Sequence, residues 1–163
     1  MNRAYLLIGG NQGDRQNYLK MATEKIEPAL GSISGRSALY ETAPWGRTDQ
    51  PAFLNQAIAL DTPLSAPQLM GALLSIEGDI GRIRAEKFGP RIIDIDILFF
   101  NDEIMEEEGL VIPHPQFAYR RFALEPMNEL APGLLHPVLH KTMGALLEAC
   151  TDNLDVKKLG PRI

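Results

Sequence analysis

Residues 89–100, GPRIIDIDILFF, constrain this chain more than any other stretch, because they combine an apolar strand pattern with two acids. Side chains of a β-strand alternate between two faces, so residues two apart share a face. One face would hold Ile93, Ile95, Ile97 and Phe99, and the other Asp94, Asp96, Leu98 and Phe100. We therefore expect a strand over residues 92–100 that is buried on both faces at one end and carries two carboxylates at the other.

The two acids, Asp94 and Asp96, have a chemical consequence. Same-face neighbours on a strand lie roughly 6.5–7 Å apart. Two carboxylates at that separation in a half-buried site repel, and each resists ionisation unless a cation lies between or beside them. Mg²⁺ is the natural cation because it takes one or two carboxylates and fills its remaining positions with water and phosphate oxygens. The alternative is a solvent-facing strand end with two ordinary Asp side chains.

The segment before this strand is basic, although the chain as a whole is acidic. Its net charge of −5 argues against a general nucleic-acid-binding surface. Residues 101–108, NDEIMEEE, hold five acids and no base, whereas residues 82–91 hold one acid and four cations: Arg82, Arg84, Lys87 and Arg91. Guanidinium groups beside acids that can hold a metal are what a phosphate-transfer site requires. A solvated loop with chance charge is the alternative.

Periodicity and capping residues predict the element order β-α-β-β-α-β. Strands are expected at residues 4–8, 33–41, 53–60 and 92–100. Asp14 would cap a helix that runs to about Leu30, where Gly31 stops it. Ser65 and Gln68 form a capping-box pattern for a second helix, which Gly81 closes. The apolar stripe of this second helix would be Leu69, Leu73, Ile76 and Ile80.

This order is the split βαβ, or ferredoxin-like, arrangement of α+β proteins, an antiparallel sheet with helices packed against it. The C-terminal additions are an apolar run at residues 110–112, a segment at 116–130 and a helix near 143–150. We expect them to cover another part of the sheet, and residues 1–163 to form a single domain. The fold alone does not specify a function, since this topology hosts many activities.

Composition excludes several classes of protein. A content of 45% apolar residues in 163 is enough for a substantial core. One cysteine, Cys150, rules out an internal disulfide and fits a reducing compartment. The apolar run near the N-terminus is too short for a signal peptide or a membrane span, so we expect a cytoplasmic protein. The sequence has no Walker P-loop, no signature of a nucleophilic triad and no cysteines for zinc.

Five segments resemble, in order and spacing, the 6-hydroxymethyl-7,8-dihydropterin pyrophosphokinases of folate biosynthesis. They are GGNQGDRQNYL, ETAPWG, QPAFLNQ, GRIRAEKFGPRIIDIDIL and VIPHPQFAYRRFAL, and they span residues 4 to about 130. The resemblance implies a monomeric ferredoxin-like enzyme that moves pyrophosphate from ATP to the pterin hydroxymethyl group, leaves AMP and uses two Mg²⁺ ions. Another magnesium-dependent nucleotidyl- or phosphotransferase, and a binding module without activity, are the alternatives.

The resemblance also implies a role for individual residues. Asp94 and Asp96 would hold both metal ions, and Arg82 and Arg91 would join them as catalytic residues. ATP contacts are implied for Glu77, Arg84, Arg91, Ile97, His114 and Arg120. Pterin contacts are implied for Thr42, Ala43, Trp45, Phe53, Asn55, Asp94 and Phe122. Two aromatic faces suit a planar heterocycle, and an Asn amide offers its edge both a donor and an acceptor. The expected partners are these small molecules, with no nucleic acid and no membrane.

Overall fold

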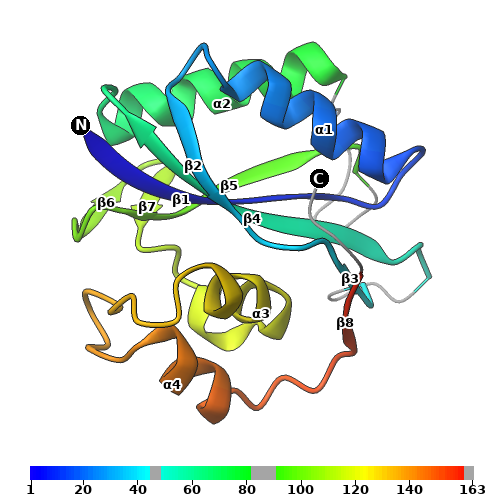
Figure 1. Cartoon of the computed structure of the whole chain (residues 1–163), viewed down its shortest axis with the longest axis vertical. Helices are drawn as coiled ribbons and strands as arrows, with labels where there is room; N and C mark the ends of the chain where they lie inside the picture. The colour runs from blue at the N-terminus through cyan, green and yellow to red at the C-terminus, as the bar shows by residue number, and fades with distance from the viewer. Residues whose placement is uncertain (45–48, 82–90, 160–163) are drawn as a thin grey trace.

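A β-sheet lies between two pairs of helices in the computed structural model, which describes residues 1–44, 49–81 and 91–159 (Figure 1). Within these residues, six strands form the sheet, with the order β5-β1-β4-β3-β8 and β2 also paired with β4. Every pair is antiparallel. The strands are β1 (Asn2–Gly10), β2 (Ser32–Arg36), β3 (Tyr40–Thr42), β4 (Phe53–Thr62), β5 (Asp94–Phe100) and β8 (Val156–Lys158).

The expected β-α-β-β-α-β order is confirmed by β1, α1 (Arg15–Ile26), β2, β4, α2 (Ala66–Ile80) and β5, with the short β3 between β2 and β4. Both helix starts form as predicted. Asp14 accepts the backbone N–H of Asn17, and Ser65 with Gln68 forms a complete capping box. Gly81 ends α2 in the left-handed conformation, with φ of 113°. The α+β, ferredoxin-like prediction therefore holds.

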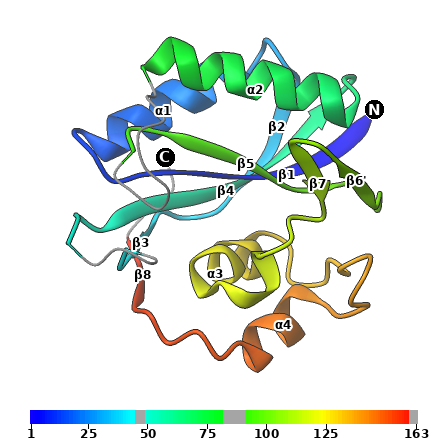
Figure 2. The same ribbon diagram turned by 180° about the vertical axis from the view of Figure 1, so that it is seen from behind.

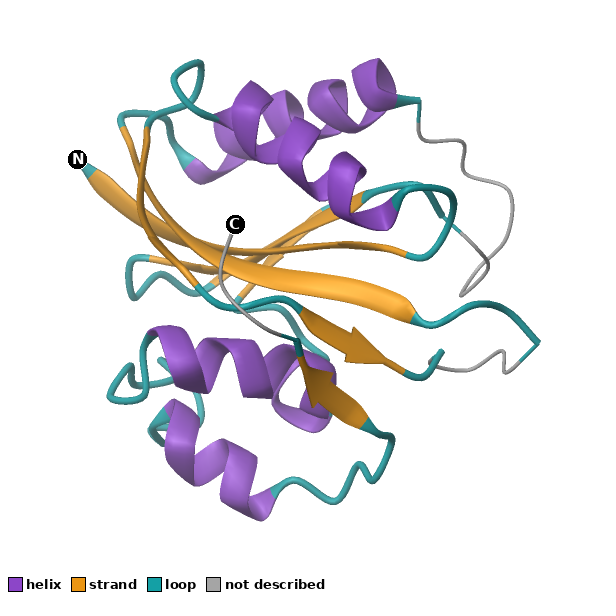
Figure 3. Cartoon of the chain, turned by 45° about the vertical axis from the view of Figure 1, so that its right-hand side comes forward, coloured by secondary structure: helices purple, strands orange, loops and turns teal. Residues whose placement is uncertain are grey.

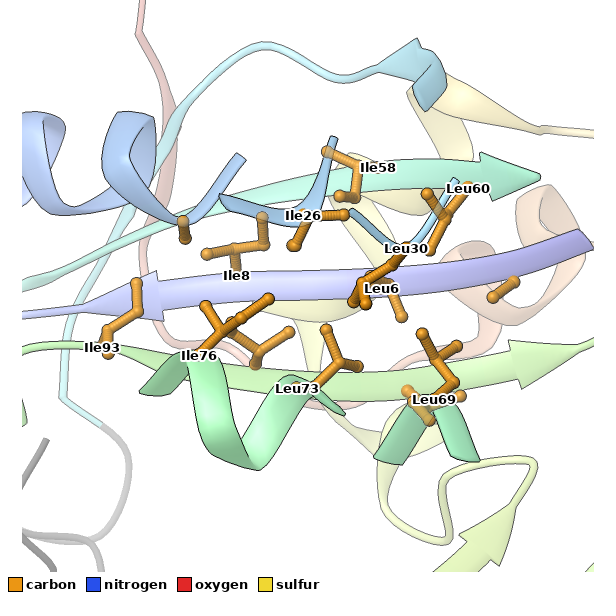
Figure 4. Packing of buried hydrophobic residues seen from close by; sticks show 14 of the residues in the cluster. Leu6, Ile8, Ile26, Leu30, Ile58, Leu60, Leu69, Leu73, Ile76 and Ile93 are labelled. Carbon is orange, nitrogen blue, oxygen red and sulfur yellow. The ribbon is translucent and has the colours of Figure 1, made fainter. Parts of the chain in front are cut away.

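The first core lies between the sheet and the pair α1 and α2 (Figure 4). Helix α2 contributes its predicted stripe, and α1 contributes Leu19, Ala22 and Ile26. The strands present alternate residues to the same layer, among them Leu6, Ile8, Ile58 and Leu60. Burying these apolar side chains stabilises this half of the fold, because each removes its surface from water.

The second core lies on the opposite face of the sheet, under α3 (Arg121–Leu130) and α4 (Met143–Ala149) (Figure 3). The expectation that C-terminal segments cover another part of the sheet is thus confirmed. Before α3 come a hairpin of β6 (Met105–Glu107) with β7 (Leu110–Ile112) and a short 3₁₀ turn, η1 (Phe117–Tyr119). In the described residues, no helix combines the length and apolar composition needed to cross a membrane.

Helix α1 ends at Ile26 rather than at the predicted Leu30. Pro28 is the cause, because a proline disfavours helical geometry in the residue before it. Glu27 is accordingly extended, with φ of −100° and ψ of 128°. Leu30 still reaches the first core from the loop, which explains why its apolar character was consistent with a longer helix.

The predicted strand at 33–41 is two strands, β2 and β3, separated by residues 37–39. Ser37 replaces one regular ladder contact, because its hydroxyl accepts the N–H of Ala57 at 2.9 Å. The N–H of Ala38 instead donates to the carboxylate of Glu129 on α3 at 3.1 Å. The break lets β3 take a different neighbour at its outer edge, β8, a strand that the sequence did not indicate.

The alternation predicted for β5 holds from Asp94 to Leu98 and then fails. Tyr5 pairs with Phe99 and Leu6 with Ile97, so Leu98 is an extra residue that forms a β-bulge. Leu98 and Phe99 consequently both enter the second core, and Phe100 enters the first. The predicted faces of Phe99 and Phe100 were therefore wrong, because a pattern of period two cannot register an inserted residue.

Candidate active site

A cavity of about 580 Å³, counted to its open mouth, lies on the α3 side of the sheet. It is bounded by the ends of β1, β3, β4 and β5 and by the start of α3. Residues that the sequence singled out line most of it: Thr42, Ala43, Phe53, Asn55, Arg91, Asp94, Asp96, Arg120 and Phe122. Leu7 and Gly9 of β1 complete the lining and were not predicted. Sheet topology thus brings distant parts of the chain to one place.

The two acids of β5 face this cavity from neighbouring positions of the same strand face. Asp96 pairs with Leu7 and Asp94 with Gly9 across the β1 ladder. The Nη1 atom of Arg91 lies 2.8 Å from Oδ2 of Asp94. Burial, followed by repulsion from Asp94 and Glu77, raises the pKa of Asp96 to about 7, although Arg91 and Arg120 act in the opposite direction. The local arginines therefore leave part of this negative charge uncompensated.

That electrostatic imbalance fits a divalent cation. A cation near Asp94 and Asp96 favours their ionised forms, and Mg²⁺ needs only one or two protein carboxylates. Within the described residues, no group of three or more His, Cys, Asp or Glu side chains is arranged to hold a metal. The donor set is therefore unsuited to a closed structural zinc site and suited to an ion that shares its coordination shell with phosphate oxygens.

Glu77 fixes the strand that carries the two acids. Its side chain is buried on α2, and its Oε2 atom accepts the backbone N–H of Ile95 at 2.6 Å. Ile95 lies between the two aspartates in the sequence, so this bond holds β5 against α2 beside the cavity. Glu77 also contributes to the raised pKa of Asp96.

Buried polar atoms lie on the opposite side of the cavity. Among the residues that the structure describes, Oγ1 of Thr42 and Nδ2 of Asn55 are buried without a hydrogen bond. Such atoms are costly unless a ligand or water satisfies them. Gly9 sets the position of Asn55, because a Cβ at residue 9 would lie 2.0 Å from Oδ1 of Asn55. The site is thus built to hydrogen-bond the edge of a polar molecule.

Two half-buried aromatic side chains, Phe53 and Phe122, line the same cavity as these polar atoms. The guanidinium carbon of Arg120 lies 5.6 Å from the centre of the Phe122 ring, within the range of a cation–π contact. Arg120 also donates a hydrogen bond to Oε1 of Gln116. Aromatic surface next to a polar edge-binding group suits a flat heterocycle.

Not every predicted residue lines the cavity. The side chain of Ile97 is buried in the first core, on the other face of the sheet. His114 lines a separate groove, where its Nδ1 accepts the N–H of Gln116. Burial, with a smaller effect of Arg120, lowers the pKa of His114 to about 4. Trp45, Arg82 and Arg84 lie outside the described residues, so their predicted roles stay predictions.

Asn11 is a site residue that the sequence analysis missed. Its buried amide accepts the N–H of Arg91 and donates to Oε1 of Gln50 and the carbonyl of Pro51, all at 2.9 Å. Its backbone N–H also donates to the carbonyl of Arg91. It therefore joins the chain entering β5 to the chain entering β4. The signal was present as an Asn directly after two glycines at the end of β1.

Two carboxylates and two arginines thus lie in one cavity with two aromatic side chains and buried polar atoms. This combination on an antiparallel α+β sheet defines a metal-dependent transferase of phosphate groups, in which positioning and charge stabilisation dominate catalysis. A family model described as 7,8-dihydro-6-hydroxymethylpterin-pyrophosphokinase matches residues 5–132. The chain belongs to this family.

Curated relatives agree with the family match. The chain is 45% identical to the 2-amino-4-hydroxy-6-hydroxymethyldihydropteridine pyrophosphokinase of Methylorubrum extorquens, over 83% of this chain and 86% of that protein. It is 41% identical to the enzyme of the same name from Bacillus subtilis, over 79% of this chain and 78% of that protein. It is therefore, like them, an ATP-dependent diphosphotransferase of the pyrophosphokinase type.

The fold has a solved counterpart as well. The wild-type HPPK-DHPS of Plasmodium falciparum, crystallised with pteroate, superposes with a TM-score of 0.74 at 20% identity. The match covers 91% of this chain but 44% of that one, so the chain spans less than half the length of this solved protein. At this identity the likeness supports the fold alone.

Proposed function

We propose that this protein transfers the pyrophosphoryl group of ATP to the hydroxymethyl group of 6-hydroxymethyl-7,8-dihydropterin, in folate biosynthesis. One observation carries the proposal. The unsatisfied polar atoms of Thr42 and Asn55 lie in the same cavity as the two aspartates of β5. A pterin bound by its edge at the first pair can direct its hydroxymethyl group toward phosphates held at the second.

The pterin half of the site uses a small number of contacts. Phe53 and Phe122 supply aromatic surface for the ring, and Asn55 supplies an amide for its edge. Thr42 and Ala43 close the wall formed by β3. We propose that Trp45 contributes from the segment that follows. A rigid aromatic ligand loses little conformational entropy on binding, so these contacts suffice to orient its reactive group.

The nucleotide half of the site uses charge. Arg91 and Arg120 line the cavity, and their guanidinium groups would neutralise phosphate oxygens. We propose further ATP contacts for Glu77, His114, Arg82, Arg84 and the main chain of Ile97. Asp94 and Asp96 would hold Mg²⁺, and we propose two ions. An ion held by these two carboxylates would supply positive charge to offset the negative charge that develops on the phosphates during transfer.

The reaction then needs no protein nucleophile. The hydroxymethyl oxygen forms a bond to the β-phosphorus of ATP, and the bond from that phosphorus to the oxygen bridging toward the α-phosphate breaks. AMP leaves with the bridging oxygen, and the hydroxyl proton is released. The residues of this chain hold the two substrates in line and exclude competing orientations, which accounts for most of the rate gain in such reactions.

The remaining parts of the proposal concern the state of the protein. We propose a cytoplasmic monomer of one domain that binds small molecules and no nucleic acid. The net charge of −5 supports the last point, because a polyanion is repelled by such a surface. A single free cysteine, Cys150, supports a reducing compartment.

Product analysis tests the function directly. Purified protein is incubated with ATP, Mg²⁺ and 6-hydroxymethyl-7,8-dihydropterin, and the products are separated and weighed by mass spectrometry. We expect AMP and pterin diphosphate in equal amounts, and no AMP when the pterin is omitted. Release of free pyrophosphate with an AMP-linked pterin would identify a nucleotidyltransferase instead. No turnover at all would leave a binding module and contradict the proposal.

A further inference from the structure

Exposed apolar side chains gather at the end of the molecule that carries the β6–β7 hairpin. In the described part of the chain, eight large apolar side chains are exposed, and all but Met1 and Leu74 belong to this region. They are Ile104, Val111, Tyr119, Leu135, Val138 and Leu139. The hairpin and the loop between α3 and α4 lie together there, away from β3 and β8, in both views (Figures 1 and 2). Clustered exposure of this kind marks interaction sites in soluble proteins.

Most of these side chains share one groove. The groove runs between the hairpin, η1 and the α3–α4 loop, and its volume out to open solvent is about 800 Å³. Ile104 and Val111 line it from the hairpin side, Tyr119 from η1, and Val138 and Leu139 from the loop. We call this set the hairpin groove. It lies apart from the cavity that holds Asp94 and Asp96.

The loop wall of the hairpin groove is rigidly built. The Nδ1 atom of buried His136 accepts the N–H groups of both Val138 and Leu139, at 3.2 and 3.1 Å. The His136 ring in turn packs edge-to-face on Phe99 of the second core, with ring centres 5.6 Å apart. Val138 and Leu139 therefore stay exposed because the fold holds them outward. Fixed apolar side chains lose little entropy when a partner covers them.

The hairpin rim of the groove is strongly acidic. Residues 102–108 contain five carboxylates and no cation, and Glu106 lines the groove itself. Among the described residues, none of the five forms an ion pair: Asp102, Glu103, Glu106, Glu107 and Glu108. Cations belong to the other walls, where Arg120 follows Tyr119 of η1 and Lys141 follows the α3–α4 loop residues. An apolar floor with a one-signed hairpin side specifies the charge of the segment that lies against that side.

We propose that the hairpin groove binds a partner protein through a basic amphipathic segment, with its apolar side chains against Ile104, Val111 and Leu139 and its Lys or Arg side chains toward Glu106 and Glu107. Helix-in-groove recognition uses this combination of spaced apolar anchors and complementary charge. His114, for which an ATP contact is proposed, also lines the groove, but the residues that carry this inference, Ile104, Glu106, Val111 and Leu139, do not line the catalytic cavity.

Charge decides against the other occupants. A second copy of this chain, meeting the groove in a symmetric contact, would bring one acidic rim against another. Anionic lipid surfaces and nucleic acids carry the same sign as the rim and are repelled. A basic segment alone gains from both the apolar floor and the carboxylates.

The test uses a defined peptide and residue-level mapping. The probe is a fluorescein-labelled amphipathic peptide of about 18 residues, with Leu on one helical face and Lys on the other. We expect saturable binding by fluorescence polarisation, with amide NMR shifts concentrated at Ile104, Val111, Tyr119, Val138 and Leu139. A matched peptide with Glu in place of Lys should show no binding. Shifts spread evenly over acidic surface, or none at all, would overturn the proposal.

Matched variants separate the groove from general acidity. Glu106→Lys with Glu107→Lys should weaken peptide binding by about tenfold or more, because the rim charge is reversed. Glu24→Lys with Glu148→Lys changes the net charge equally at exposed sites elsewhere and should change the affinity by less than about twofold. Leu139→Ser tests the apolar floor against Leu74→Ser on α2. Equal effects of the paired variants, or self-association through this face in sedimentation, would contradict the proposal.

Pyrophosphoryl transfer and thermal unfolding show whether each of these variants is still folded. None of the substituted residues lines the catalytic cavity, so pyrophosphoryl transfer and thermal unfolding should stay close to the wild-type values. Loss of peptide binding with normal turnover supports the groove, whereas retained binding in both the rim and the floor variants rules it out.

Discussion

The two faces of β5 differ in how completely helices cover them. On one face, Ile95 and Ile97 lie under α1 and α2 in a continuous apolar core, which Ile93 joins from just before the strand. On the other face, Leu98 enters the second core, but Asp94 and Asp96 reach beyond its edge into the cavity. Incomplete cover at one end of a sheet thus creates the site. The same strand supplies stability through one set of side chains and chemistry through the alternating set.

The strongest test of this division is Asp96→Asn. Turnover should fall by about a thousandfold, or roughly 4 kcal/mol of barrier, if the carboxylate holds a catalytic metal. The free energy of unfolding should rise rather than fall. Because the pKa of Asp96 is raised, the folded state keeps its proton between about pH 4 and 7, whereas the unfolded state has lost it. The ionised carboxylate therefore destabilises the fold above this range.

Urea unfolding at pH 8 without metal, together with a steady-state assay, measures both effects. The variant should be at least as stable as the wild type and nearly inactive. Asp102→Asn, on an exposed turn, is the control and should alter neither value. An active Asp96→Asn enzyme would remove this residue from the metal site.

The opposite face of β5 is tested by Leu73→Ala. Leu73 is fully buried against the strands, and its truncation leaves a cavity, so unfolding should become easier by about 3 kcal/mol. Turnover of the folded fraction should be unchanged. The neighbouring Leu74, which is 45% exposed, gives the control, since Leu74→Ala should cost less than about 0.5 kcal/mol. Equal losses would mean that α2 does not pack as described.

Phe122→Ala tests the pterin wall. It should weaken pterin binding by about 1–2 kcal/mol through lost ring contact, and by more than it weakens ATP binding. Isothermal calorimetry with each ligand measures the two losses. Tyr119→Ala, an exposed aromatic outside the cavity, should leave both affinities unchanged. A larger loss for ATP than for the pterin would move Phe122 to the nucleotide side.

The smallest expected effect concerns His136. Burial lowers the pKa of His136, so below the ordinary value of 6.5 the unfolded chain binds a proton that the folded chain does not. Stability should therefore fall as the pH drops below this value, with a slope of at most about 1.4 kcal/mol per pH unit. The difference between wild type and His136→Asn, followed by urea unfolding from pH 7.5 to 5.5, isolates this effect. An equal dependence of stability on pH in the wild type and in His136→Asn would contradict this assignment.

Local sequence signals predicted the elements well because their causes are local. Asp14, Ser65 with Gln68, and Gly81 act on backbone groups within one helical turn. The failures have causes outside the pattern of any one strand. Ser37 interrupts its strand by bonding to β4, and Leu98 forms a bulge that depends on pairing with β1. Strand β8 contains two lysines in three residues and has no apolar face to reveal it.

The residues of the candidate site differ in what was needed to predict them. The chemistry of Asp94, Asp96 and Arg91 could be argued from the residues, because acids at strand spacing beside cations restrict the ligand. Phe53 and Phe122 needed the family resemblance, since an aromatic residue in a sequence is equally compatible with a core. Gly9 and Asn11 required three dimensions, because their roles depend on the close approach of β4 and of the chain before β5.

The two aspartates of β5 also protect the register of the sheet. If β5 paired with β1 one position out of step, every side chain on its first half would change face, and both aspartates would be trapped beneath α1 and α2. Dry apolar surroundings penalise unpaired carboxylates by several kcal/mol each. Misaligned chains are therefore disfavoured by the very acids that the finished enzyme uses, so catalytic residues here double as a safeguard against misfolding.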